Sequence, residues 1–153
     1  MIYRCKYFDI LELIPPDLWE HHKHEPHKLW LLFDVRALIT LDRLRKVYGP
    51  LVINDWHRGG ALTLRGWRPA NTSTGAVFSQ HKFGRAFDLT PSSKSEATVD
   101  MIREDIRQDA ALLRQNPTIL NTIAEYITCI EMGVPWIHFD TRNWLGPLLE
   151  VKP

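Results

Sequence analysis

The clearest pattern of apolar and polar positions in the chain lies between residues 34 and 48. Apolar residues recur there at the three- and four-residue spacing of one helical face, while Arg36, Asp42 and Arg43 lie on the opposite side. Gly49 and Pro50 follow directly and are typical of a helix end. We therefore predict a helix over residues 34–48, with a core face made of Ala37, Leu38, Leu41, Leu44 and Tyr48.

Three other stretches have the composition or alternation of strands. Residues 51–54 form a short apolar run with β-branched side chains, and residues 85–89 alternate between two faces, with Asp88 opposite Phe87. Residues 126–141 hold two apolar runs on either side of the turn residues 132–135, which predicts an antiparallel hairpin.

The remaining segments predict helices and loops. Ser95 can cap a helix that runs to about Arg114, and a second helix is expected to begin near Pro117, with a core stripe at Ile119, Ile123, Tyr126 and Ile127. Residues 55–74 are rich in turn residues and predict a long irregular loop, in which we expect substrate contacts. Residues 1–33 form a helical or irregular lead-in.

These elements predict an α+β fold, in which a small antiparallel sheet is packed with helices. The length of 153 residues and a hydrophobic content of 44% suit one domain over residues 1–153 with a core of its own. Residues 51–142 hold the segments that carry candidate chemistry.

Charge and cysteine content narrow the classes of function. The 19 Lys and Arg residues nearly balance the 18 Asp and Glu residues, so no nucleic-acid or membrane partner is indicated, and we expect a monomer. Cys5 and Cys129 are too few for a thiolate zinc site, so a metal here must use histidine and carboxylate ligands. The N-terminal residues have neither the pattern of a signal peptide nor that of a spanning helix, which predicts synthesis in the cytoplasm.

Residues of this ligand type occur in two places. SQHKFGRAFD (79–88) contains His81 and Asp88, and in the predicted last strand Trp136, His138 and Asp140 share one face. A turn at residues 132–135 also brings Glu131 beside His138 across the hairpin. Three protein ligands with a carboxylate close by are what a catalytic zinc site requires.

Each of these residues also has a simpler interpretation when it is taken alone. A buried histidine on a strand is more often a hydrogen-bonded core residue than a metal ligand, an aspartate such as Asp88 often caps a turn, and Gly84 can be a plain turn glycine. The joint pattern is what favours a metal site.

That joint pattern, SxHxxGxAxD followed by WxHxD, resembles zinc peptidases of the D-alanyl-D-alanine carboxypeptidase and hedgehog-domain type, especially the short phage and bacterial peptidoglycan peptidases. The resemblance implies their fold and one zinc ion per chain, with His81, Asp88 and His138 as its ligands. It also implies that Arg58, in the INDWHR stretch, holds a substrate carboxylate or polarises the scissile carbonyl, and that Ser79 hydrogen-bonds the substrate or a ligand.

The sequence departs from this family at one position. Many relatives place the catalytic glutamate three residues before the second histidine, where this chain has Pro135. Glu131 is then the favoured general base, and Asp140 is the second choice, with the alternative role of orienting a ligand histidine. The implied activity is cleavage of peptidoglycan stem peptides by zinc-activated water, at D-Ala-D-Ala or at L-Ala-D-Glu. The alternative is an inactive zinc-containing domain that binds the cell wall or belongs to a phage structure.

The resemblance also suggests how such an enzyme reaches its substrate. Without a signal peptide, we expect release to the wall through a phage holin or transport in a virion.

Other residues invite a functional interpretation with less support. Four histidines, His21, His22, His24 and His27, are interleaved with lysine and proline, and an exposed polar loop is the simpler prediction. His57 is a further substrate-binding candidate because it is adjacent to Arg58. Arg65 and Arg68 can line the same cleft, although solvated loop arginines are the more common case. Trp56 and Trp67 can form a platform for the substrate or pack to anchor the loop.

Overall fold

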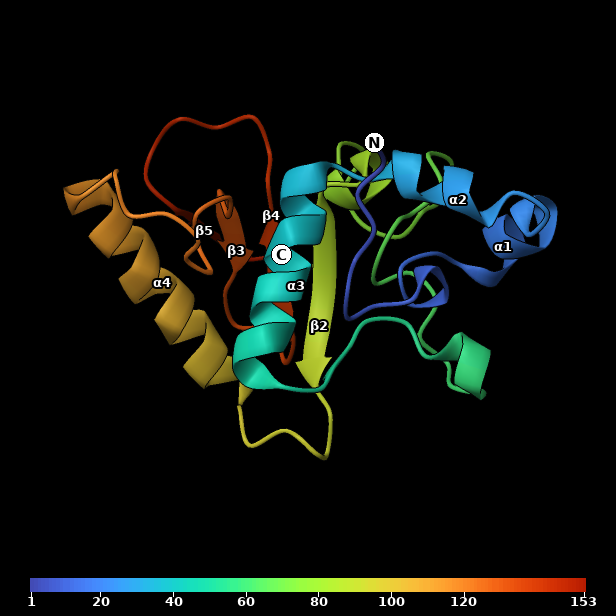
Figure 1. Cartoon of the computed structure of the whole chain (residues 1–153), viewed down its shortest axis with the longest axis horizontal. Coiled ribbons are helices and arrows are strands. Elements are labelled where there is room, and N and C mark those ends of the chain that lie inside the picture. The colour runs from blue at the N-terminus through green and yellow to red at the C-terminus, as the bar shows by residue number, and fades with distance from the viewer.

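The computed structural model, which describes residues 1–153, contains a five-stranded sheet with the strand order β1-β2-β4-β3-β5 (Figure 1). The strands are β1 (Leu51–Val52), β2 (Ala86–Pro91), β3 (Cys129–Glu131), β4 (Ile137–Asp140) and β5 (Leu149–Val151). The α-helices are α1 (Pro16–His22), α2 (Pro26–Leu29), α3 (Val35–Tyr48) and α4 (Val99–Gln115). Four short 3-10 helices complete the elements: η1 (Ile10–Glu12), η2 (Trp30–Leu32), η3 (Trp56–Arg58) and η4 (Gln80–Phe83).

This architecture confirms the predicted α+β class, but the sheet is mixed. Strands β1, β2, β4 and β3 pair antiparallel as expected, whereas β5 pairs parallel with β3. The prediction of a purely antiparallel sheet was therefore wrong at this edge. Strand β5 has only three residues, and its partner lies about twenty residues earlier, so no local alternation reveals it.

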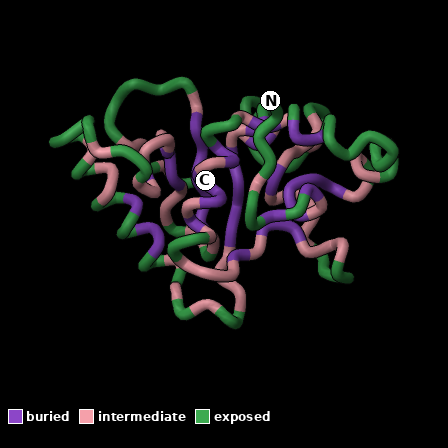
Figure 2. The backbone as a smooth tube through the Cα atoms, in the orientation of Figure 1, coloured by how far each residue is buried: buried purple, intermediate pink, exposed green.

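Helix α3 has the predicted core face and packs on β2. The Asp34 side chain accepts a hydrogen bond from the Arg36 backbone N–H and caps the first turn, and Gly49 ends the helix. The rings of Phe33 and Phe87 stack with centroids 5.5 Å apart, directly before α3 and within β2. Helix α4 packs beside β4, so helices cover one face of the sheet (Figure 1). Buried apolar side chains of α3, α4 and the strands form the core, and the backbone there is coloured as buried in Figure 2.

The predicted hairpin is confirmed as β3 and β4. Asp88 lies opposite His138 in the β2–β4 pair, and Ile130 lies opposite Phe139 in the β3–β4 pair. The buried Arg103 side chain of α4 donates to the carbonyls of Val134 and Trp136 and holds the hairpin turn in place. Since Ile130 pairs with Phe139, the next residue along β3, Glu131, lies across from His138.

The helix predicted to end near Arg114 is confirmed as α4 with a later start, and the helix predicted after Pro117 was wrong. Helix α4 is capped by Thr98 rather than Ser95, whose hydroxyl group instead donates to the Tyr48 carbonyl. No helix follows Pro117, because Asn121 adopts a left-handed conformation with φ +65°, which a continuous helix cannot contain. Within this stretch Ala124 and Ile127 are buried and Ile123 packs on the core, whereas Leu120 is exposed. The predicted core stripe is therefore confirmed only at Ile123 and Ile127.

The lead-in and the long loop have little regular structure. Residues 1–33 contain short helices, and the four histidines predicted to lie in a loop are exposed but fall in and around α1 and α2. Residues 55–74 are irregular apart from η3, as predicted. None of the helices combines the length and the apolar character that crossing a membrane requires.

Candidate metal centre

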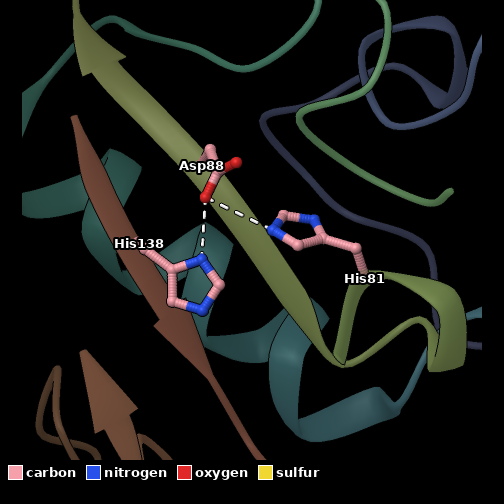
Figure 3. Close-up of side chains that lie close together, drawn as sticks. All are labelled: His81, Asp88 and His138. Atoms are coloured by element: carbon pink, nitrogen blue, oxygen red, sulfur yellow. Dashed lines mark hydrogen bonds and ion pairs between the residues drawn. The ribbon is translucent and has the colours of Figure 1, made fainter. Parts of the chain in front are cut away.

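Three side chains from three elements point toward one another on the sheet face opposite α3 (Figure 3). They are His81 of η4, Asp88 of β2 and His138 of β4. Asp88 Oδ1 lies 2.8 Å from His138 Nδ1 and 3.3 Å from His81 Nε2. All three side chains are buried, with 2–6% of each residue exposed.

Gly84 positions the loop that carries His81. This glycine ends η4 in a left-handed conformation with φ +64°, and a Cβ atom there would collide with the carbonyl of Leu32. Its own carbonyl accepts a hydrogen bond from the Asp34 backbone N–H, which joins the loop to the start of α3. The glycine of the SxHxxG motif is thus required sterically.

The His81 ring is oriented by the backbone of a neighbouring segment. Its Nδ1 lies 2.8 Å from the Gly66 carbonyl oxygen, so Nδ1 carries the proton and Nε2 presents a lone pair. Gly66 in turn packs so closely on Leu13 that any Cβ would collide with the Leu13 carbonyl. His81 Nε2 and Asp88 Oδ1 are therefore two acceptors that face each other, an arrangement that a cation between them stabilises.

The His138 ring is oriented from its far side by Asp140. Asp140 Oδ2 lies 3.4 Å from His138 Nε2, and the residue is fully buried. Arg142 neutralises this carboxylate, since its Nε donates to Oδ1 at 2.8 Å. A carboxylate on the outer nitrogen of a histidine is the usual partner of a metal-binding imidazole.

Arg68 balances the charge of Asp88. Its Nη2 donates to Asp88 Oδ2 at 2.8 Å, and its Nε donates to the Leu64 carbonyl at 2.6 Å. One carboxylate oxygen is therefore held by the arginine, and the other is left facing the two histidines.

The surroundings shift the pKa values of all three residues. Burial disfavours the charge on Asp88, but its hydrogen bond with His138 and its close contact with His81 outweigh this effect and hold the pKa of the carboxyl well below its usual range. Burial lowers the pKa of His81 more than Asp88 raises it. Burial would also lower the pKa of His138, but its hydrogen bonds with Asp140 and Asp88 raise it to about 9.

Glu131 lies beside this group without belonging to it. Its Oε1 is 3.9 Å from His138 Nδ1, the ring nitrogen that faces Asp88, and its side chain is 20% exposed. The position confirms the register argument from the hairpin. Asp140 lies on the opposite ring nitrogen, so the two carboxylates flank His138 from different sides.

The ligand atoms of His81, Asp88 and His138 fit a metal ion. All three lie within 4.8 Å of one another, and two imidazole nitrogens with one carboxylate oxygen suit a borderline cation. The two acceptors that face each other, His81 Nε2 and Asp88 Oδ1, also favour a cation between them. The buried group can therefore hold a metal ion.

Three other predicted site residues are not members of this group: Arg58, His57 and Ser79. Arg58 is exposed on 70% of its side chain, and its polar partners are Glu12, at 3.7 Å, and His57 Nε2, at 3.0 Å. Neither partner belongs to the metal group. Ser79 directly precedes η4, and its side chain does not cap that helix.

Sequence reasoning missed two partners of the metal group. The sequence predicted Arg68 to be a cleft residue or a solvated loop arginine and indicated no role for Arg142, although each pairs with a buried aspartate. The available signal was physical, because a buried carboxylate needs a cation or hydrogen-bond donors. Spacing alone does not show which arginine supplies them.

Comparisons of the chain with protein-family models, with curated proteins and with solved structures found no match. The function of the centre is therefore inferred from its own residues and from the motifs that contain them.

Proposed function

We propose that this chain is a zinc-dependent peptidase that cleaves stem peptides of peptidoglycan. The observation that carries the proposal is the position of Glu131, 3.9 Å from the His138 nitrogen that faces Asp88. A histidine-aspartate-histidine ligand set with a free carboxylate beside it is the combination needed for metal-assisted hydrolysis. A structural zinc site usually has four protein ligands, most often with cysteine.

The metal that we propose for His81, Asp88 and His138 is zinc. When bound, it supplies Lewis-acid chemistry, which polarises a carbonyl and makes water more acidic. Two histidines and one aspartate leave a coordination position for water or substrate.

Glu131 is assigned as the general base. Its carboxylate takes a proton from the attacking water and returns it to the leaving amine. Asp140 is assigned a different role, because it is fully buried, bound to Arg142 and located on the outer nitrogen of His138. It fixes the orientation of that ring.

The substrate class comes from the resemblance of SxHxxGxAxD and WxHxD to D-alanyl-D-alanine carboxypeptidases and hedgehog-domain peptidases. These motifs in this order also favour the corresponding fold, a single enzyme domain, and a phage or prophage origin with release by a holin or in a virion. Pro135 is the departure from that pattern, and Glu131 compensates for it by its place across from His138.

The test compares Glu131→Gln with Glu20→Gln, an exposed control in α1. We expect wild-type protein and the control to release peptides from purified peptidoglycan, and Glu131→Gln to keep its zinc while losing activity by about 10²- to 10⁴-fold. Unchanged hydrolysis in Glu131→Gln would rule out this base. Zinc binding without hydrolysis in the wild type would instead favour an inactive wall-binding or phage structural domain.

A further inference from the structure

We propose that the groove between α4 and the loop that joins β4 to β5 binds an uncharged glycan chain built from N-acetylhexosamine units. The choice of sugar rests on the proposed function, because such units form the glycan strands that carry the stem peptides of peptidoglycan. A carbohydrate as such is indicated by an aromatic ring, by amide groups and by the balance of charges that line the groove.

The groove is separate from the metal group. It has a volume of about 1020 Å³, and α4, residues 117–128, the loop after β4 and Glu150 of β5 line it. That loop arches away from the sheet beside the C-terminal end of α4 (Figure 1). Glu150 pairs in register with the buried Ile130 and meets Arg107 of α4. The groove therefore opens on the helix-covered face of the sheet, whereas the metal group lies on the other face.

A fixed aromatic ring stands at one side of the groove. Trp144 is 43% exposed, and its Nε1 donates to the Pro147 carbonyl at 2.7 Å. A Cβ atom at Gly146 would collide with the indole, so the ring packs directly on that glycine. The neighbouring Leu145 is fully exposed. Exposed apolar groups of this kind often mark binding sites, and the negative face of an indole attracts the C–H groups on one face of a sugar ring.

The side of the groove formed by α4 supplies amide groups. Gln108, Ala111 and Gln115 follow one another at four- and three-residue intervals and so share one side of the helix. The small Ala111 leaves room between the two amides. Gln108 Nε2 donates to Glu104 at 3.1 Å, which leaves its second N–H and its amide oxygen for a ligand. Sugar hydroxyl and acetamido groups need such donors and acceptors.

The ionic side chains of the groove cancel one another. Glu104 and Glu150 each contact Arg107 at 2.8 Å, which leaves one negative charge in that group. Glu125 is neutralised by an arginine of α3. The exposed Arg114 supplies one positive charge. The groove therefore carries no net charge, which favours an uncharged ligand over an anionic or a cationic polymer.

The same charges argue against a second protein as the occupant. Charged residues are depleted from the buried centre of protein interfaces, whereas five charged side chains line this groove. A sugar combines an apolar face with a polar edge, and so matches an indole on one side and amides on the other. A glycan held here keeps the chain on its polymer, which raises the effective concentration of stem peptides around the metal group.

The experiment titrates the wild-type chain calorimetrically with the N-acetylglucosamine hexamer. This probe carries no stem peptide, so its binding is measured without zinc and without turnover. Trp144→Ala removes the ring, Trp144→Phe keeps an aromatic face without the N–H, and Gln108→Ala removes one amide. The matched control is Phe78→Ala, because Phe78 is an aromatic residue that is 77% exposed and lies outside the groove.

We expect Trp144→Ala to weaken binding of the hexamer about 10-fold or more, and Gln108→Ala to weaken it about 3- to 10-fold. Trp144→Phe should retain most of the affinity, and Phe78→Ala should bind like the wild type. Because the groove has no net charge, the affinity should change less than about 2-fold between about 50 mM and about 0.5 M NaCl. Equal unfolding transitions show that the variants are folded.

Three results would overturn the inference. The first is a hexamer that the wild type does not bind, or that Trp144→Ala binds as tightly as Phe78→Ala does. The second is tighter binding of the glucosamine hexamer, which is cationic, because it would reveal a negative field in the groove. The third is a dimer in sedimentation that Trp144→Ala dissociates, because a second copy of the chain would then cover the groove.

Hydrolysis of peptidoglycan by the wild type tests the proposed function separately. A chain that hydrolyses peptidoglycan but does not bind the hexamer keeps its function and loses this inference. A chain that binds the hexamer through Trp144 without hydrolysis keeps the glycan groove and loses the peptidase assignment.

Discussion

Asp140 and His138 lie two residues apart on β4, and the carboxylate of Asp140 meets the outer nitrogen of the His138 ring, with Oδ2 3.4 Å from Nε2. The inner nitrogen, Nδ1, is left for Asp88 and for a metal ion. One strand therefore supplies both a candidate metal ligand and the group that orients it.

Removing the charge of Asp140 should weaken metal binding without removing a ligand. For Asp140→Asn we expect zinc affinity to fall about 10- to 100-fold. The reason is that the His138 ring loses its ionic partner and donates its electron pair to the metal less strongly. Competition with a coloured chelator measures the change. Asp100→Asn, at a side chain that is 93% exposed, is the control and should bind zinc like the wild type. Equal affinities in the two variants would contradict the orienting role.

Two glycines with similar backbone conformations should respond differently to alanine. Gly84 and Gly133 have φ values of +64° and +76°, but only at Gly84 does a Cβ meet other atoms. We expect Gly133→Ala to cost about 1 kcal/mol in the free energy of unfolding, from backbone strain alone. Gly84→Ala should cost about 2–4 kcal/mol and reduce zinc content, because the loop that carries His81 must move away from Leu32. Urea unfolding of both variants measures the two losses in the free energy of unfolding. Losses of similar size would show that the close approach of Gly84 to Leu32 is unimportant.

The cap of α3 should make stability depend on pH in acid. Burial would raise the pKa of Asp34, but hydrogen bonds from the Arg36 side chain and backbone outweigh this effect and lower it. The pKa of Asp34 in the folded chain is therefore below its unfolded value of about 3.9. The stabilisation that the ionised Asp34 side chain contributes is complete above that pH, and it is lost as the pH falls through the folded pKa. Asp34→Ala should cost about 1 kcal/mol at pH 7 and progressively less below about pH 4. Asp34→Asn, which keeps a capping oxygen without the charge, is the matched control. A cost for Asp34→Ala that stays constant down to about pH 2 would contradict the role of the carboxylate.

Zinc should stabilise the folded chain through the candidate centre. At a free zinc concentration 100 times the dissociation constant, binding adds about 2.7 kcal/mol, which corresponds to roughly 5–10 °C in melting temperature for a chain of this size. Differential scanning fluorimetry with and without zinc measures the shift. A variant with asparagine in place of His21, His22, His24 and His27 should keep the shift, and His81→Ala should lose it. The reverse pattern would locate the bound metal in the exposed histidines.

The sequence predicted those parts of the fold that local patterns determine. The apolar spacing of residues 34–48 predicted α3, and the turn residues between two apolar runs predicted the β3–β4 hairpin, hence also the place of Glu131. Strand β5 could not be predicted, because its three residues pair with β3 only after residues 141–148 have closed a loop. The helix expected after Pro117 was wrong because periodicity does not reveal the left-handed Asn121.

The metal group was predictable from its residue types, but the arginines around it were not. Arg58, Arg65 and Arg68 all lie in one irregular loop, where no period indicates which side chain turns toward the sheet. In the structure Arg68 meets Asp88 and Arg65 meets Thr90, while Arg58 extends toward Glu12. These directions depend on backbone hydrogen bonds of residues 64–68 to β2 and η4, which are long-range contacts.

The central claim is that His81, Asp88 and His138 hold one zinc ion per chain. Its most direct test is the metal content, by plasma mass spectrometry, of protein purified without a histidine tag or a nickel column and washed with a mild chelator. We predict one zinc per chain in the wild type and in the variant that lacks His21, His22, His24 and His27, and none in His138→Ala. Zinc that is absent from the wild type, or that remains in His138→Ala at the wild-type level, would contradict the claim.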